Sequence, residues 1–159
     1  MDAKAHFMAA ALEESRRALP ACRPNPPVGS VIVRGDAIVA RGFTGRPGEH
    51  HAEAAALAHV PAGLDPAELT LFVTLEPCSF VRRTPSCALT LVSFGIRRVI
   101  VGTIDPHPRN RGRGLEILRD AGVHVELGVL EHEVLAFIEP YLIRTDDDAE
   151  VRQSVPHSH

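Results

Sequence analysis

Apolar positions recur along the chain with the two spacings that distinguish amphipathic helices from strands. Residues 3–19 place apolar side chains at helical spacing among Glu and Arg, which predicts a helix that ends before Pro20. Further helices are predicted over residues 51–60, 86–94, 114–121 and 130–143. Short apolar runs predict strands over residues 28–33, 37–43, 69–75, 98–103 and 123–127. This order, a hairpin followed by strand–helix–strand units, favours an α/β fold in which a mixed sheet of about five strands carries helices on both faces.

Proline and glycine mark the breaks between these elements. Three prolines within residues 23–27 fix the backbone angle φ and remove hydrogen-bond donors, so this segment is predicted to be a stiff, non-helical loop. Residues 76–85 are predicted to form a second irregular loop. No internal repeat or second domain is apparent in the pattern. We therefore expect one domain over residues 1–145, followed over residues 146–159 by an acidic and polar tail that is predicted to be disordered.

The composition is that of an ordinary globular domain. Of the 159 residues, 45% are hydrophobic and 23% are charged, and a chain of this length can bury roughly 70% of its unfolded surface. No run approaches the ~20 apolar residues that span a bilayer, and the N-terminus lacks the charged and apolar regions of an export signal. We therefore expect a cytoplasmic protein that makes no contact with a membrane.

The net charge and the number of cysteines bear on which ligands the protein binds. The formal net charge is −3, with one Tyr and no Trp, which argues against a general nucleic-acid-binding protein because such a protein needs a basic surface. The three cysteines are an odd number. Without an export signal, they indicate a reduced compartment and a metal-binding or catalytic use rather than a disulfide framework.

The strongest chemical signal is formed by His51, Glu53, Cys78 and Cys87. One imidazole and two thiolates suit zinc, and three protein ligands leave the fourth position open, as in catalytic rather than structural sites. His51 and Glu53 lie two residues apart at the start of a predicted helix, so one can hold the metal while the other faces its bound water. Cys87 lies in the first turn of another predicted helix, where the helix dipole favours a thiolate.

Four segments carry a resemblance to a known family. Zinc deaminases share the signature H-x-E…P-C-x-x-C, but here eight residues separate the two cysteines. This long spacing, within TLEPCSFVRRTPSC at residues 74–87, resembles the deaminase domain of the bacterial bifunctional riboflavin-biosynthesis enzyme, a branch of the cytidine-deaminase-like superfamily. The likeness extends to PNPPVGSVIV at residues 24–33, to GEHHAE at residues 48–53, and to DPHP and GRG within residues 105–114. It covers roughly residues 1–143.

The resemblance implies a three-layer α/β/α sandwich that binds Zn²⁺ through His51, Cys78 and Cys87. The implied reaction is hydrolytic deamination, in which zinc makes a water molecule acidic enough to attack the ring carbon that bears the amine. Glu53 would pass the water proton to a ring nitrogen and then to the leaving amine, a role typically worth ~10²–10⁴-fold in rate. The family's substrate is a phosphorylated diaminopyrimidine of riboflavin biosynthesis. Related enzymes are usually dimers or tetramers, so a homo-oligomer is expected.

The resemblance also implies contacts to the substrate. Asn25 matches an Asn that contacts the ring or the ribose, Arg83 matches the basic residue that faces the phosphate, and Asp105 matches a ribose contact. Arg113 belongs to a basic loop with two further arginines. Such a loop is either a phosphate clamp, because Arg presents a planar fork of donors, or an ordinary solvated loop.

Three positions depart from the family pattern and leave the substrate open. Thr44, Phe80 and His107 stand where the family usually has His, His and Asn, and all three positions face the substrate in the family. None is a zinc ligand, so the chemistry is retained while the pocket is altered. A deaminase of another nucleobase, nucleoside or pteridine-like compound is therefore the alternative. A deaminase of tRNA or single-stranded nucleic acid is less favoured, because that branch has the short cysteine spacing and a basic surface.

A hypothesis of another class is a non-catalytic, zinc-stabilised binding domain. Glu53 argues against it, because a structural zinc site gains nothing from a carboxylate beside an open position.

Two further residues have open roles. Glu76 either orients groups behind the metal loop or is purely structural, and Cys22 is interpreted as a free thiol near a loop.

Overall fold

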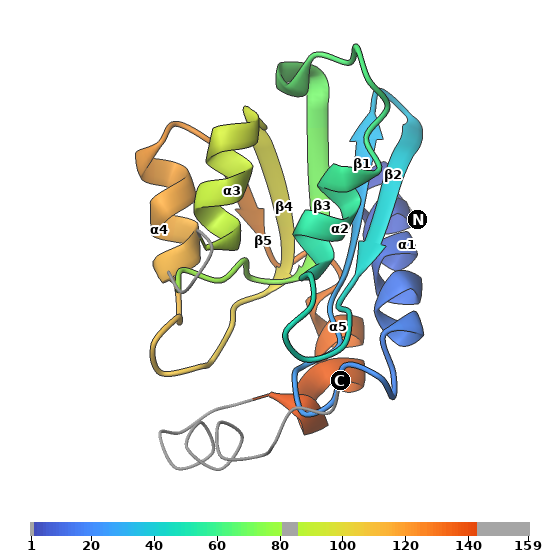
Figure 1. Ribbon diagram of the computed structural model, residues 1–159, viewed down its shortest axis with the longest axis vertical. Helices are drawn as coiled ribbons and strands as arrows, with labels where there is room; N and C mark the ends of the chain where they lie inside the picture. The colour runs from blue at the N-terminus through green and yellow to red at the C-terminus, as the bar shows by residue number, and fades with distance from the viewer. Residues whose placement is uncertain (1, 81–85, 143–159) are drawn as a thin grey trace.

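The computed structural model describes residues 2–80 and 86–142, and its strands form one mixed sheet (Figure 1). The strands are β1 (Gly29–Arg34), β2 (Ala37–Phe43), β3 (Leu69–Leu75), β4 (Arg98–Thr103) and β5 (His124–Leu127). Their order across the sheet is β2-β1-β3-β4-β5. The strand β1 pairs antiparallel with both β2 and β3, whereas the β3–β4 and β4–β5 pairs are parallel. The predicted five-stranded mixed sheet is therefore confirmed.

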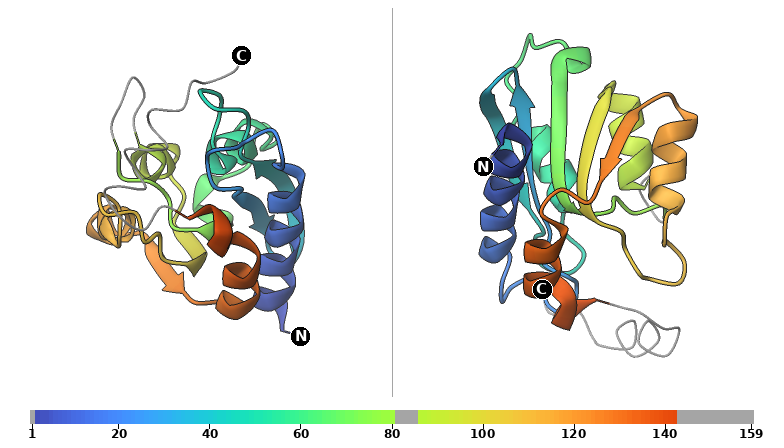
Figure 2. Two further views of the ribbon diagram at one scale, coloured as in Figure 1. Left: turned by 90° about the horizontal axis from the view of Figure 1, so that it is seen from below. Right: turned by 180° about the vertical axis from the view of Figure 1, so that it is seen from behind.

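Helices cover both faces of the sheet and complete the three predicted layers (Figures 1 and 2). One face carries α1 (Ala3–Arg17) and α5 (Glu131–Ile138), and the other carries α2 (Ala52–Ala58), α3 (Cys87–Phe94) and α4 (Arg113–Asp120). Two short 3₁₀ helices, Pro66–Glu68 and Glu139–Tyr141, complete the regular structure. No helix in the described part of the chain has the length and apolar character that crossing a membrane requires.

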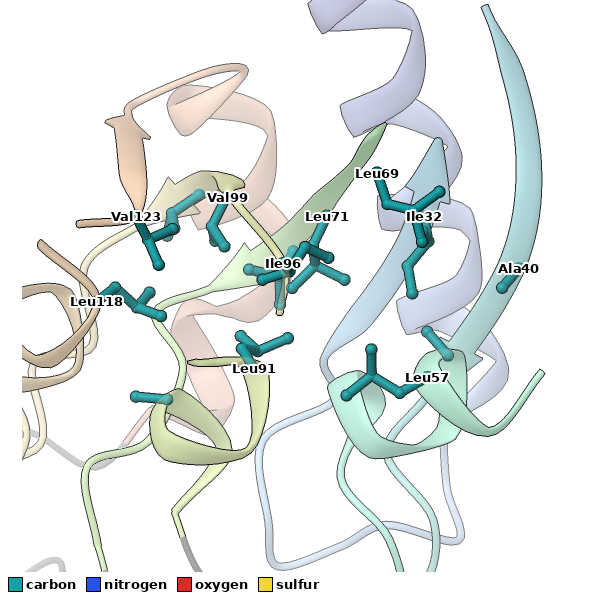
Figure 3. Packing of buried hydrophobic residues seen from close by; sticks show 14 of the residues in the cluster. Ile32, Ala40, Leu57, Leu69, Leu71, Leu91, Ile96, Val99, Leu118 and Val123 are labelled. Atoms are coloured by element: carbon teal, nitrogen blue, oxygen red, sulfur yellow. The ribbon is translucent and has the colours of Figure 1, made fainter. Parts of the chain in front are cut away.

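Two hydrophobic clusters hold the layers together, because successive strand residues point to opposite faces of the sheet. In β1, Ile32 packs with the α2, α3 and α4 side, while Val31 and Val33 pack with the α1 and α5 side. Figure 3 shows the first cluster, where Leu57 and Leu91 lie between their helices and the sheet. Both faces are buried, so the central strands are nearly continuous apolar runs.

The prediction for the last helix was wrong. A single helix was expected over residues 130–143, but α5 ends at Ile138 and a 3₁₀ turn follows over Glu139–Tyr141. Pro140 explains the change, because proline has no N–H to donate and its ring clashes with the carbonyl four residues earlier in an α-helix. The strands β2, β3 and β4 coincide with the prediction, and the other predicted helices and strands differ from the observed bounds by one or two residues.

The edge strand β5 is tied to α1 by a cluster of charges around Glu126. Its Oε1 atom lies 2.7 Å from Lys4 Nζ, 3.4 Å from Arg98 Nη2 and 3.3 Å from His124 Nε2. The hydrogen bond from Lys4 is the main reason that the pKa of Glu126 falls from 4.5 to about 2. A depressed carboxyl pKa stabilises the folded protein above the unfolded pKa, and this contribution disappears as the pH falls through the folded value.

We predict that Glu126→Gln lowers the free energy of unfolding at neutral pH by only about 0.5–1 kcal/mol, because solvent screens this partly exposed cluster. The difference between wild type and variant should shrink as the pH falls from 4.5 towards 2, and it should also shrink in high salt. Urea titrations at several pH values measure both trends. A difference that stays constant over this pH range would show that the charge of Glu126 does not matter.

Candidate metal centre and active site

The fold brings His51, Cys78 and Cys87 together. Their candidate ligand atoms all lie within 4.8 Å of one another. The Nδ1 atom of His51 is 3.0 Å from the Sγ atom of Cys87 and 3.8 Å from that of Cys78. Residues from three separate segments therefore converge on one small volume.

Each ligand is placed by the end of a secondary-structure element. His51 is the N-cap residue of α2, Cys78 lies in the loop that follows β3, and Cys87 is the first residue of α3. The hydroxyl of Ser86 caps α3 by accepting a hydrogen bond from the Leu89 N–H at 3.2 Å. Because helix N-termini favour negative charge, the start of α3 stabilises a thiolate at Cys87.

Close backbone packing fixes the start of α2. A Cβ atom at Gly42 of β2 would overlap the carbonyl oxygen of Ala52 and the backbone nitrogen of Ala56. The hydroxyl of Ser30 in β1 donates to the same Ala52 carbonyl at 2.8 Å. Glycine at this position lets α2 lie directly on the strands, which places His51 and Glu53 over the loop after β3.

The side chains of Cys78 and Cys87 interact directly. The Cys87 thiol donates to the Cys78 sulfur, which lowers the pKa of Cys78 and raises the pKa of Cys87. The backbone N–H of Cys87 also donates to Cys78 Sγ at 3.3 Å. A divalent cation bound between these residues would contact both sulfur atoms and the imidazole. One nitrogen and two sulfur donors are a set that Zn²⁺ prefers, so these residues fit a zinc ion.

Glu53 is a buried carboxyl in the first turn of α2, with 4% of its surface exposed. Burial raises its pKa to about 7, the negative charge at Cys78 adds to the rise, and the charge of His51 opposes it. A carboxyl with a pKa near neutrality can both accept and release a proton at physiological pH. It therefore has the property that a proton shuttle beside a metal centre requires.

Glu76 organises the loop behind the metal centre. Its carboxylate accepts hydrogen bonds from the backbone N–H groups of Asp105, Gly112 and Leu115, at 3.0, 2.9 and 3.2 Å. Burial raises its pKa, and these three hydrogen bonds counteract the rise. Glu76 thus joins the end of β3 to the start of α4 and to the loop between β4 and α4. It takes the anion position at the N-terminus of α4, which has no side-chain cap of its own.

Three of the predicted substrate residues, Phe80, His107 and Asp105, are linked by contacts. The rings of Phe80 and His107 pack edge to face with their centroids 5.0 Å apart. The Nδ1 atom of His107 accepts a hydrogen bond from the Arg109 N–H at 3.1 Å, so a neutral His107 carries its proton on Nε2. The Asp105 carboxylate accepts from the His107 N–H at 2.9 Å.

The other predicted substrate residues that the structure describes are Thr44, Asn25 and Arg113. The Thr44 hydroxyl donates to the Val28 carbonyl at 3.3 Å and accepts from the Val28 N–H at 3.1 Å. Asn25 is half-buried, and its carbonyl accepts a hydrogen bond from the Cys22 thiol at 3.4 Å. Arg113 is exposed at the start of α4, and Arg83 lies outside the described residues. The roles of all these residues toward a substrate stay predictions.

Sequence reasoning did not single out Asn110, which lies next to this site. The residue is fully buried, and its side chain contacts the loop around Cys78. In the sequence it is one polar residue among prolines and arginines, so no local pattern distinguishes it from a solvated loop residue.

Comparisons with known proteins agree with this geometry. The model of the cytidine and deoxycytidylate deaminase zinc-binding region matches residues 1–103. The riboflavin biosynthesis protein RibD of Aquifex aeolicus is 40% identical over 136 residues, which are 86% of this chain and 38% of that protein. RibD of Escherichia coli is 41% identical over 139 residues, 87% of this chain and 37% of that protein. The chain thus spans less than two-fifths of the length of these relatives.

Solved structures are similar over the same part of the chain. The diaminohydroxyphosphoribosylaminopyrimidine deaminase/5-amino-6-(5-phosphoribosylamino)uracil reductase of Thermotoga maritima superposes with a TM-score of 0.82 at 40% identity, covering 87% of this chain and 40% of that one. RibD of Acinetobacter baumannii superposes with a TM-score of 0.80 at 38% identity, covering 87% of this chain and 38% of that one. The agreement confirms the predicted family resemblance and fold.

We predict that the purified protein carries about one zinc ion per chain and that Cys87→Ala loses it, because two ligands cannot replace three. Cys22→Ala is the matched control, since Cys22 is an equally buried cysteine outside the cluster. Elemental analysis after gel filtration measures the zinc content. Equal zinc content in the two variants would contradict the assigned ligand set.

Proposed function

Because the chain belongs to the family of cytidine and deoxycytidylate deaminases that share a zinc-binding region, we propose that it is a zinc-dependent hydrolytic deaminase. It would remove an exocyclic amine from the phosphorylated diaminopyrimidine of riboflavin biosynthesis. The observation that carries the proposal is the buried Glu53 carboxyl beside the cluster of His51, Cys78 and Cys87. A zinc site that only stabilises the fold has no use for such a group.

The proposed mechanism assigns a task to each residue. His51, Cys78 and Cys87 would hold Zn²⁺, which when bound makes water acidic enough to attack a ring carbon at neutral pH. Glu53 would accept the water proton, because it is the buried carboxyl that lies against the three ligands. It would then donate this proton to the ring nitrogen and help a second proton reach the leaving amine. Water supplies the oxygen of the new carbonyl group, and the amine leaves as ammonia.

The similarity to RibD proteins supports the choice of substrate. The deaminase/reductase of Thermotoga maritima is named for a phosphoribosylaminopyrimidine, and its similarity covers most of this chain. We propose that Asn25 and Asp105 contact the ring or the ribose, and that Arg83 and Arg113 face the phosphate. Because Glu76 already accepts the hydrogen bonds of Gly112 and Leu115 at the start of α4, phosphate binding would depend on arginine side chains rather than on that helix terminus.

A second candidate is a deaminase of another amino-substituted heterocycle. The observation that favours it is the environment of Thr44 and Phe80, two residues that stand where the family usually has histidines. The Thr44 hydroxyl gives its proton to the Val28 carbonyl, and Phe80 packs its apolar ring against His107. If both positions face the substrate, as they do in the family, they offer it fewer hydrogen-bond donors than two histidines would. Assembly into a dimer or tetramer stays an expectation from the resemblance.

We predict that Glu53→Gln lowers kcat by about 10²–10⁴-fold while the zinc content stays at the wild-type level, because the variant keeps the ligands and loses the proton carrier. Ammonia release measures kcat on a panel that contains the phosphorylated diaminopyrimidine, its dephosphorylated form, cytosine and guanine. Glu14→Gln is the matched control, since Glu14 is an equally buried glutamate on α1, remote from the cluster.

The panel separates the hypotheses. Turnover of the phosphorylated diaminopyrimidine supports the first candidate, whereas turnover of a free base alone supports the second. A zinc-loaded protein that releases ammonia from no member of the panel would favour the non-catalytic binding domain. Wild-type activity in Glu53→Gln would show that another group carries the proton.

A further inference from the structure

We propose that Asn110 is a positioning residue that joins the loop carrying the metal ligand Cys78 to the loop carrying Asp105 and His107. The inference rests on the proposed zinc site, and it assigns to Asn110 no contact with the metal or the substrate.

The Asn110 side chain binds the backbone on both sides of Cys78. Its Oδ1 atom accepts a hydrogen bond from the Ser79 N–H at 3.0 Å, and its Nδ2 atom donates to the Pro77 carbonyl at 3.4 Å. These groups belong to the two peptide units that flank the Cα atom of Cys78. One carboxamide therefore restrains both backbone angles of Cys78, and through them the position of its Sγ atom.

The same carboxamide also reaches the neighbouring loop. Its Nδ2 atom donates to Oδ2 of Asp105 at 3.1 Å, and Oδ1 of Asp105 accepts from the His107 N–H. The backbone N–H of Asn110 donates to the His107 carbonyl at 2.9 Å. Asn110 is fully buried, so water does not compete for these hydrogen bonds.

The three contacts require an asparagine in one orientation. Ser79 offers a donor, whereas Pro77 and Asp105 offer only acceptors, so the oxygen must face Ser79 and the amino group must face the other two. An aspartate would keep the bond to Ser79 but would place a negative oxygen against the Pro77 carbonyl and the Asp105 carboxylate. Asn110→Asp therefore removes the junction between the loops with almost no change in size.

Other contacts hold the two loops in the fold when the Asn110 side chain is removed. Glu76 binds the backbone of Asp105, Gly112 and Leu115, and Gly114 packs against the Pro77 carbonyl so closely that a Cβ atom would overlap it. Loss of the Asn110 side chain thus leaves the loops attached and the Cys78 carbonyl bonded to the Ala88 N–H, but it removes the restraint on the peptide units on both sides of Cys78. The expected defect is a misplaced ligand rather than an unfolded protein.

The test measures zinc affinity by competition with a chromophoric chelator in wild type, Asn110→Ala and Asn110→Asp. Groups that hold metal ligands in place typically contribute about 10- to 100-fold to metal affinity, and we expect losses of this size in both variants. Cobalt-substituted protein supplies a second readout, because the thiolate-to-metal absorption bands should shift when the Cys78 sulfur moves.

The matched control is Ile138→Ala, which removes a buried side chain from the opposite face of the sheet. It should lower the melting temperature while zinc affinity and the cobalt spectrum stay at wild-type values. A general loss of stability therefore cannot imitate the effect expected of Asn110.

A double-mutant cycle tests the junction itself. If Asn110 joins the loops, Asp105→Ala should weaken zinc binding in the wild-type background and have no effect in the Asn110→Ala background. Equal effects of Asp105→Ala in both backgrounds, or wild-type affinity and spectra in Asn110→Asp, would overturn the inference while the proposed function stands. Failure of the wild-type protein to bind zinc at all would overturn the proposed function and this inference with it.

Discussion

The rest of the site depends on one constraint, which is that two sulfur atoms and one imidazole nitrogen are held within 4.8 Å of one another. The sulfur atoms of Cys78 and Cys87 and the Nδ1 atom of His51 come from three segments, so no local structure could bring them together. The sheet supplies the frame, because β3 ends at the loop that carries Cys78, while α2 and α3 begin beside it. Packing of the apolar side chains thus brings together two sulfur atoms and one nitrogen, a donor set that binds a zinc ion.

Much of this arrangement could be predicted from the sequence because its signals are local. The strands β3 and β4 are buried on both faces and therefore read as apolar runs with clear ends. The ligands His51, Cys78 and Cys87 stand in motifs whose residue types and spacing are typical of zinc deaminases. The role of Glu53 could be predicted because this residue lies two positions after the ligand His51.

The rest depends on contacts between residues far apart in the chain, which no local pattern reports. Glu76 and Asn110 act through hydrogen bonds to residues as many as 39 and 33 positions away in the chain, and the same residue types are common in solvated loops. The hydrogen bonds between the Thr44 hydroxyl and the Val28 backbone likewise depend on the pairing of β1 with β2. The end of α5 is different, because Pro140 is a local signal that ends the α-helix although the apolar pattern continues.

The three ligands differ in how far water reaches them. His51 is exposed, Cys78 is half-buried, and Cys87 lies inside beside the buried Glu53. The imidazole therefore belongs to the solvent-facing side of the centre, and the Glu53 carboxyl belongs to its buried side.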